Sequence, residues 1–176
     1  MPWTFAHPAA VLPLRRYCPA YFNFAALMIG ALTPDFGYYV GQFGIATLAH
    51  TFVGSFLVCL PTGMLLLAAF YLVRRPVWYL LPEPHRTALE PFLSRPTPTR
   101  FADLARAGLS VLLGAWTHIM WDSFTHRSGW TVVQFPWLPY QELQHVSTVF
   151  GVAVLAIAYY FWLRRQWGGS ILAARA

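Results

Sequence analysis

ARAGLSVLLGAWTHIMWDSF (residues 105–124) is one of the most apolar stretches of the chain, yet it contains a histidine and an aspartate. Its length and apolar character predict a helix over residues 102–125, which is enough to cross a bilayer because a span needs about 20 residues. His118, Asp122 and His126 follow one another at intervals of four, so they share one face of that helix. Gly114 and Ser110 continue the same face towards the start of the helix. A stripe of small and polar residues is typical of the packed face of a membrane helix.

The composition of the whole chain agrees with a membrane protein. Hydrophobic residues make up 57% of the 176 residues and charged residues only 10%, whereas soluble domains contain roughly a quarter charged residues. The length predicts one domain. We therefore predict an all-α fold, in which residues 1–176 form a single integral membrane domain, a polytopic bundle of about four hydrophobic helices.

Three further apolar segments are candidates for the other helices of this bundle. They are residues 20–33, 47–73 and 146–163. The first is short for a span. In the second, we expect Pro61 to kink the helix, which membrane helices tolerate where neighbours satisfy the backbone. We expect Arg164 and Arg165 to end the fourth helix.

The connections and the arginines predict the orientation in the membrane. Residues 74–100 contain six prolines and predict a surface loop with one short helix, and residues 127–143 predict an aromatic loop at the opposite side. If the region 74–106 is cytoplasmic, eleven of the twelve arginines lie inside and only Arg127 lies outside. Two arrangements of the N-terminus stay open: it lies inside, or residues 7–17 form a short helix running inward so that the N-terminus lies outside.

Charge and cysteine content exclude some classes of partner. The net charge of +6 comes from arginines alone, and these are spread among the membrane boundaries without forming a basic stripe. We therefore predict no nucleic-acid partner. Cys18 and Cys59 show no paired spacing and predict free thiols.

Histidines and aspartates, both possible metal ligands, recur at the outer ends of the apolar segments. Because unpaired charges in hydrocarbon are costly, such residues face the bundle interior and find partners there. Imidazole and carboxylate groups are ligands of zinc-type ions, and the set is large enough for one or two divalent ions, of which zinc fits best. A leftover histidine, His126 or His145, would donate a proton to a leaving group. The residues at this depth are Asp35, His50, His118, Asp122, His126 and His145, with His7 added if the N-terminus lies outside.

Other interpretations of the same residues stay open. His118 and Asp122 also fit a buried hydrogen-bonded pair that locks two helices together, and Asp35 fits a residue that caps a turn. His50 and His118 also fit the axial ligands of a haem, but a haem does not explain the two aspartates.

Four motifs in order carry a resemblance to a known family. MPWTFAH (1–7), TPDFGYY (33–39), HTFVGS (50–55) and THIMWDSFTH (117–126) resemble the bacterial integral membrane family of domain of unknown function 4184. The chain is also similar to proteins catalogued as membrane-bound metal-dependent hydrolases, and distantly to zinc phospholipase C and P1 nuclease. The resemblance implies that the metal ligands are His7, Asp35, His50, His118 and Asp122.

One departure from the distant relatives limits this expectation. Their three-zinc sites use a later His-x-x-x-Glu, whereas here His145 is followed four residues on by Val149. We therefore do not expect a full three-zinc site.

Together these patterns predict a function in the bacterial inner membrane. The leading hypothesis is a metal-dependent hydrolase that acts on a lipid or lipid-linked phosphate or ester at the outer face. The alternative is a non-catalytic membrane scaffold in which a polar or metal-binding cluster ties the helices together. An open coordination position separates the two, because a structural metal site is closed whereas a catalytic one keeps a water molecule.

Overall fold

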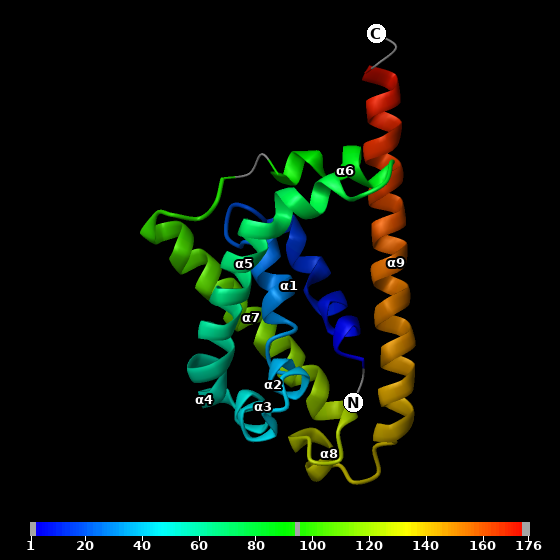
Figure 1. Ribbon diagram of the computed structural model, residues 1–176. Coiled ribbons are helices and arrows are strands. Elements are labelled where there is room, and N and C mark those ends of the chain that lie inside the picture. The colour runs from blue at the N-terminus through cyan, green and yellow to red at the C-terminus, as the bar shows by residue number, and fades with distance from the viewer. Residues whose placement is uncertain (1–2, 94–95, 174–176) are drawn as a thin grey trace.

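The computed structural model describes residues 3–93 and 96–173, and every regular element in these ranges is helical (Figure 1). Three helices are long: α5 (Leu60–Tyr79), α7 (Phe101–Thr125) and α9 (Tyr140–Ala173). The prediction of an all-α fold is confirmed for this part of the chain. The shorter elements are the 3₁₀ helix η1 (Thr4–Tyr17), α1 (Phe24–Gly30), α2 (Phe36–Tyr39), α3 (Phe43–Ala49), α4 (Phe52–Gly54), the π-helical turn η2 (Ser55–Cys59), α6 (His85–Leu93) and α8 (Trp130–Gln134).

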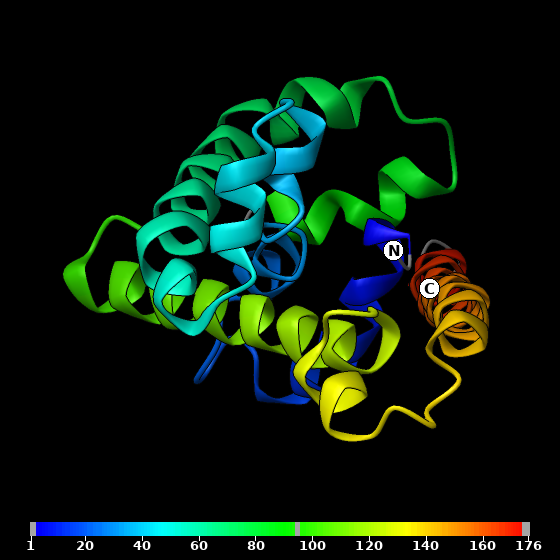
Figure 2. The ribbon, with the colours of Figure 1, turned by 90° about the horizontal axis from the view of Figure 1, so that it is seen from below.

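The N-terminal residues form a hairpin at the centre of the molecule. In Figure 1, η1 rises from the end where α8 lies, and α1 returns towards that end. The helix α1 packs mainly on α7 and also on α5, whereas η1 packs between α7 and α9 (Figure 2). Of the two arrangements left open by the sequence, the structure has the hairpin, which places residue 3 at the same end of the molecule as α8.

The contact between α1 and α7 depends on glycines. A Cβ atom added at Gly114 would collide with the α1 backbone, and one added at Gly30 would collide with the backbone of Val111. The stripe that begins at Ser110 on α7 is buried against this contact. The predicted small-residue face is therefore the face on which α7 packs, and it brings the two backbones close together.

Two helices are long and apolar enough to cross a membrane. They are residues 52–79 and 140–166, and in their most apolar windows only 17% and 6% of the residues are buried. Leu65, Leu72 and Val149 are among the large apolar side chains that they expose. In a soluble protein such helices would be buried core elements, so their exposed surface is the kind that hydrocarbon covers. The helix α1 has only seven residues, or about 10 Å, and does not cross a core of about 30 Å.

The proline at which we expected a kink in the second apolar segment lies next to a π-helical turn. Pro61 lies at the start of α5, and the π-helical turn η2 ends immediately before that helix. A proline clashes with the carbonyl group four residues earlier, and a wider π turn relieves such a clash. The helix α5 then continues through Pro76 to Tyr79, so the first six residues of the predicted loop 74–100 are helical. Within that loop, α6 is the one short helix that we expected.

The prediction that Arg164 and Arg165 end the last helix is wrong. The helix α9 begins at Tyr140 and continues past both arginines to Ala173. Arginine is a good helix former, so these residues mark the end of the apolar surface and not the end of the helix.

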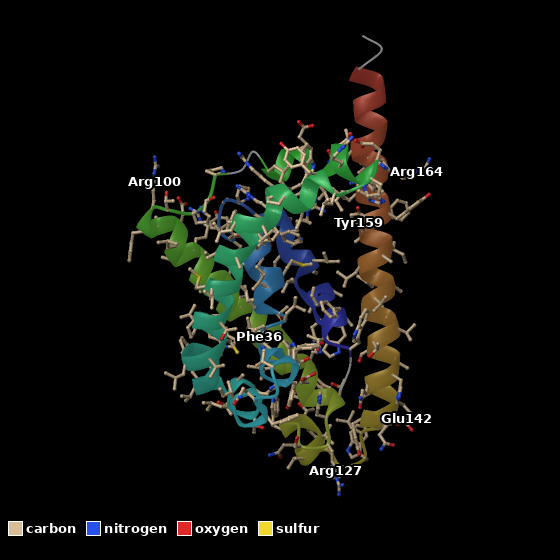
Figure 3. The ribbon with its side chains drawn as sticks, in the orientation of Figure 1. Phe36, Arg100, Arg127, Glu142, Tyr159 and Arg164 are labelled. Atoms are coloured by element: carbon tan, nitrogen blue, oxygen red, sulfur yellow. The ribbon has the colours of Figure 1, made fainter. Side chains whose placement is uncertain are left out.

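Charged residues lie at both ends of this fold. Figure 3 shows Arg100 and Arg164 at the end where α6 lies, and Arg127 and Glu142 at the opposite end. The predicted aromatic loop 127–143 includes α8, which is held to α7 by a hydrogen bond of 2.8 Å between the hydroxyl groups of Ser123 and Thr131. The elements α2, α3 and α8 and the start of η1 all gather at the end that carries Arg127.

Candidate metal centre

The helix α7 supplies the histidine at the base of the site. The side chain of His118 is fully buried, and its Nδ1 lies 2.8 Å from the backbone oxygen of Ala31. Because a carbonyl oxygen only accepts hydrogen bonds, Nδ1 carries a hydrogen, and Nε2 is the ring atom that faces the site. A histidine held by a backbone carbonyl through its other nitrogen is typical of metal ligands. Asp122 lies one turn further on the same buried face.

His50 is fixed in the same way at a break in the chain. It follows α3, and its Nδ1 lies 2.8 Å from the backbone oxygen of Ala46. Nδ1 again carries a hydrogen, so Nε2 is the ring atom that points towards the site. The break between α3 and α4 therefore gives His50 the same tautomer as His118.

Asp35 enters the site from the turn between α1 and α2. Although it precedes α2, its side chain makes no capping hydrogen bond to that helix. Instead, Oδ2 accepts a hydrogen bond from the hydroxyl group of Thr4, and Oδ1 faces the two histidines. The structure therefore does not support the capping interpretation of Asp35.

The ionisation of Asp35 follows from its surroundings. Burial by itself raises the pKa of the Asp35 carboxyl, but the imidazole of His50, the charge of His118 and the Thr4 hydroxyl group lower it. The pKa lies below its ordinary value, so the group is a carboxylate at neutral pH. A buried carboxylate of this kind needs positive charge beside it.

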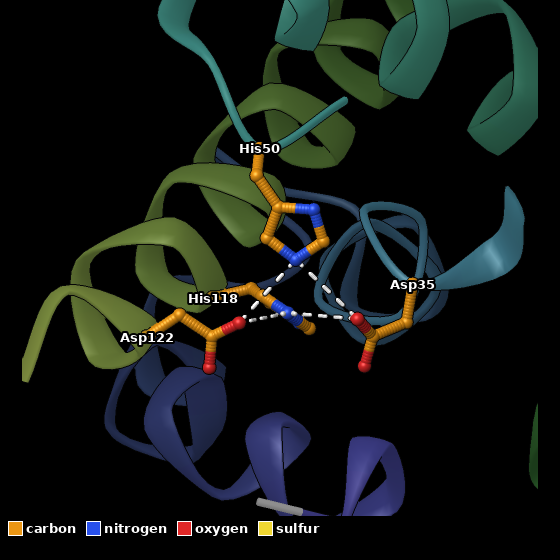
Figure 4. Close-up of side chains that lie close together, drawn as sticks. All are labelled: Asp35, His50, His118 and Asp122. Carbon is orange, nitrogen blue, oxygen red and sulfur yellow. Dashed lines mark ion pairs between the residues drawn. The ribbon is translucent and has the colours of Figure 1, made fainter. Parts of the chain in front are cut away.

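Four atoms from these residues converge on one point (Figure 4). Nε2 of His50 lies 3.3 Å from Oδ1 of Asp35 and 3.3 Å from Oδ2 of Asp122. Nε2 of His118 lies 3.6 Å from the same Asp35 oxygen and 3.2 Å from the same Asp122 oxygen. Nitrogen and oxygen thus alternate around a ring, and all four atoms lie within 4.8 Å of one another.

This ring has the chemistry and the size of a metal site. Ligand atoms held tetrahedrally at about 2.0–2.1 Å from an ion lie about 3.3–3.4 Å apart. Asp35 Oδ1, His118 Nε2 and both Asp122 carboxylate oxygens are buried without a hydrogen-bond partner among the residues that the structure describes. A divalent cation in the ring would bind Asp35 Oδ1, Asp122 Oδ2 and the Nε2 atoms of the two histidines in their neutral form.

Two more histidines lie on the other oxygen of Asp122. Oδ1 lies 3.5 Å from Nε2 of His7 and 3.4 Å from Nδ1 of His126. His7 is buried, and neither of its ring nitrogens has a hydrogen-bond partner in the described ranges. Burial lowers the pKa of His126 below its ordinary value, and its Nδ1 also lies 3.3 Å from the backbone oxygen of Asp122. The Asp122 carboxylate therefore has a pair of histidines on each side.

His145 does not join this cluster. It lies in the first turns of α9 with its ring exposed, and its Nδ1 lies 2.7 Å from the backbone oxygen of Gln141. The structure thus brings together six of the seven predicted site residues: His7, Asp35, His50, His118, Asp122 and His126.

A comparison with known proteins assigns the family. The family model described as a domain of unknown function (DUF4184) matches residues 1–175. The chain belongs to this family. None of the curated proteins and none of the solved structures matches it. The predicted membership of the DUF4184 family is confirmed, and all four motifs on which it rested lie inside the matched range.

In this DUF4184 chain the site is partly accessible. The side chains of His50 and His126 are 21% and 24% exposed, whereas those of His7, Asp35 and His118 are essentially buried. A water molecule or another small ligand would reach the centre past these two rings.

The groups that position the ligands could not be recognised from the sequence. Thr4 holds Asp35 although 31 residues separate them, and a lone threonine near a terminus carries no recognisable signal. The backbone oxygens of Ala31 and Ala46 fix the two histidine tautomers, and backbone groups leave no trace in the sequence. The relation between His50 and Ala46, four residues apart at the end of a helix, is the one that a local pattern suggests.

Proposed function

We propose that this protein is a membrane-embedded, metal-dependent hydrolase that acts on a lipid or lipid-linked phosphate or ester at the outer face of the bacterial inner membrane. The observation that carries the proposal is the ring of nitrogen and oxygen atoms from His50, His118, Asp35 and Asp122. The ring atoms of His118 and of both aspartates are buried without a hydrogen-bond partner among the described residues, and the side chain of His50 is partly exposed. Mixed imidazole and carboxylate ligands with an accessible edge are typical of hydrolytic zinc sites.

We propose zinc as the metal and two positions for it. The first lies in the four-residue ring. The second lies at Oδ1 of Asp122, beside His7 and His126, so that Asp122 would help to hold both ions.

The chain's own residues have distinct parts in such a reaction. Divalent ions supply a nucleophile from water at neutral pH and polarise a phosphoryl or acyl oxygen. His50 and His118 are held in the required tautomer by backbone carbonyls, and Thr4 fixes the orientation of Asp35. His126 is partly exposed, and it would either complete the second position as a neutral ring or, once protonated, donate a proton to the leaving group.

The placement in the membrane follows from the distribution of charge. The helices α5 and α9 are apolar enough to cross a bilayer, and we propose α7 as a further crossing element. Arg100 and Arg164 lie at the end opposite the site (Figure 3). Because arginine favours the cytoplasmic side, we infer that region 74–106 is cytoplasmic and that the site opens towards the outer face, at the level of lipid headgroups.

A non-catalytic scaffold is the second candidate. The same His–Asp contacts join η1, the turn before α2, the break after α3 and the helix α7, so they would tie the bundle together even without catalysis. Protonation of His50, which faces two carboxylates, would satisfy part of the cluster without a metal. A haem between His50 and His118 fits poorly, because the carboxylates of Asp35 and Asp122 occupy the space beside both rings.

Metal analysis of the purified full-length protein tests the proposal. We expect one or two zinc ions per chain, and hydrolysis of a chromogenic phosphodiester or ester that is lost with a chelator and restored by zinc. A protein free of stoichiometric metal would overturn the hydrolase proposal and favour the scaffold. Metal without hydrolysis of any phosphate or ester would favour a structural metal site.

A further inference from the structure

An apolar groove begins beside the metal centre. It has a volume of about 630 Å³ and lies between α7, α9 and η1. Most of its lining comes from α7, with smaller parts from α9 and η1. The lining residues are Leu113, Trp116, Thr117, Met120, Trp121, Phe124 and Thr125 of α7, Leu143 and Ser147 of α9, and Ala10 of η1. Its volume falls in the range of about 300–1,000 Å³ that is usual for small-molecule sites.

The polar groups that line the groove form hydrogen bonds within the protein. Three hydroxyl groups line it, and each donates a hydrogen bond to a backbone carbonyl of its own helix: Thr117 at 2.7 Å, Thr125 at 3.3 Å and Ser147 at 3.1 Å. The indole nitrogen of Trp116 donates to Ser55. With these polar groups satisfied within the protein, hydrocarbon is the chemistry that fits the groove.

The inner end of the groove adjoins the site. Trp121 lines the groove and also meets the ring of His7 edge-on, with centroids 5.9 Å apart. Thr125 lines the groove and lies 3.4 Å from Nδ1 of His126. Asp122 lies between these two residues in the sequence, on the neighbouring face of α7. A molecule in the groove would therefore have one end beside the Asp122 carboxylate.

The length of the groove fits half of a bilayer. It follows α7 from Leu113 to Thr125, twelve residues that rise about 18 Å along the helix. One leaflet contributes about half of a hydrocarbon core that is about 30 Å thick. Met120 and Phe124 are partly exposed, so a chain could enter sideways from the lipid.

We propose that this groove binds one hydrocarbon chain of the substrate, and so holds the phosphate or ester group of a membrane amphiphile at the metal centre. The inference rests on the proposed function for the statement that the bound lipid is the substrate. Acyl and isoprenyl chains share the required chemistry. An enzyme that acts on free soluble phosphates or esters would have no use for such a groove beside its metal.

Photo-crosslinking of the full-length protein in nanodiscs tests the inference. Two probes carry the same phosphate monoester: a phosphatidic acid with a diazirine in one acyl chain, and a polyprenyl phosphate with a diazirine in its chain. We expect labelling to concentrate on residues 113–125 of α7 compared with the exposed Leu65 and Leu72 of α5. The probe that labels the groove more strongly identifies the kind of chain.

Two variants and a matched control sharpen the test. Ser147→Phe fills the groove from α9 and Ala10→Leu fills it from η1, whereas Val149→Phe adds a ring to an exposed position on α9. If the new side chain excludes two or more methylene groups of the lipid chain from the groove, binding of the lipid weakens about tenfold. We therefore expect labelling of residues 113–125 to fall about tenfold in Ser147→Phe and to be unchanged in Val149→Phe. A melting temperature and metal content equal to wild type show that each variant is folded.

The failures of the two proposals are distinguishable. The groove proposal is overturned if the probes label α5 and α9 in proportion to their exposure, or if Ser147→Phe does not reduce labelling of the groove. It is also overturned if a second copy of the chain covers the groove and prevents labelling. None of these results depends on metal or turnover. Conversely, a protein that is labelled in the groove but contains no metal retains the lipid site and loses the hydrolase.

Discussion

The imidazole ring of His7 is stacked on that of His118, with ring centroids 3.7 Å apart and planes 15° from parallel. The two rings present their Nε2 atoms to the two different oxygens of the Asp122 carboxylate. His7 is held in place by η1, which packs on α9 where Gly151 contacts Ala6 without room for a side chain. A residue from the start of the chain and a residue from its third apolar segment thus form one face of the centre.

Replacing His7 separates the two proposed metal positions. In His7→Ala we expect the zinc content to fall from two ions to one, because the ring of His50, His118, Asp35 and Asp122 does not include His7. The measurement is elemental analysis after gel filtration, with cobalt substitution to follow the coordination spectrum of the remaining ion. If wild type contains one ion and His7→Ala retains it, the second position does not exist, and His126 is then the proton donor.

Removing the residues shared by the whole centre should abolish metal binding. We expect His118→Ala and Asp122→Ala to retain less than a tenth of the wild-type zinc, since His118 faces both aspartates and Asp122 faces four histidines. His85→Ala is the matched control, because His85 lies on α6 and contacts Tyr159 of α9, away from the site. Full metal content in both site variants would contradict the ligand assignment even if wild type is a metalloprotein.

The hydroxyl group of Thr4 should affect the metal affinity without binding the metal itself. Thr4→Val keeps the shape of the side chain but removes the hydrogen bond to Asp35, and loss of such a supporting contact weakens metal affinity about 10–100-fold. Competition with a chromogenic chelator measures this change. Thr4→Ser keeps the hydroxyl group and should restore most of the affinity, whereas a Thr4→Val affinity equal to wild type would show that Asp35 needs no such support.

The close packing of α7 on α1 predicts a difference between two glycines of the same helix. Gly114→Ala places a methyl group against the backbone of α1 and should destabilise the protein by about 1–3 kcal/mol. Gly108→Ala meets only the end of the Leu60 side chain at 3.4 Å, and the helix propensity of alanine should make it neutral or stabilising by up to about 1 kcal/mol. Thermal unfolding in detergent compares them. Equal melting temperatures for both variants would mean that the two helices separate easily.

The sequence by itself determined the helical class, the family and the ligand types. Its apolar segments and low charge predict membrane helices, and the interval of four residues places His118 and Asp122 on one helix face whatever the rest of the chain does. The small residues that continue this face predict its close packing, and α7 agrees with its predicted bounds to within one residue. These are local properties, and the period of the helix fixes them.

Only the tertiary structure decided which residues meet. The sequence left open whether the first residues form a hairpin, and the structure has the hairpin of η1 and α1, which places His7 on His118. His145 shared the expected depth of the site but points away from it, because depth along a helix does not fix the direction around its axis. The support from Thr4, Ala31 and Ala46 and the groove between α7 and α9 likewise arise from contacts between distant segments, which no periodicity within a single segment encodes.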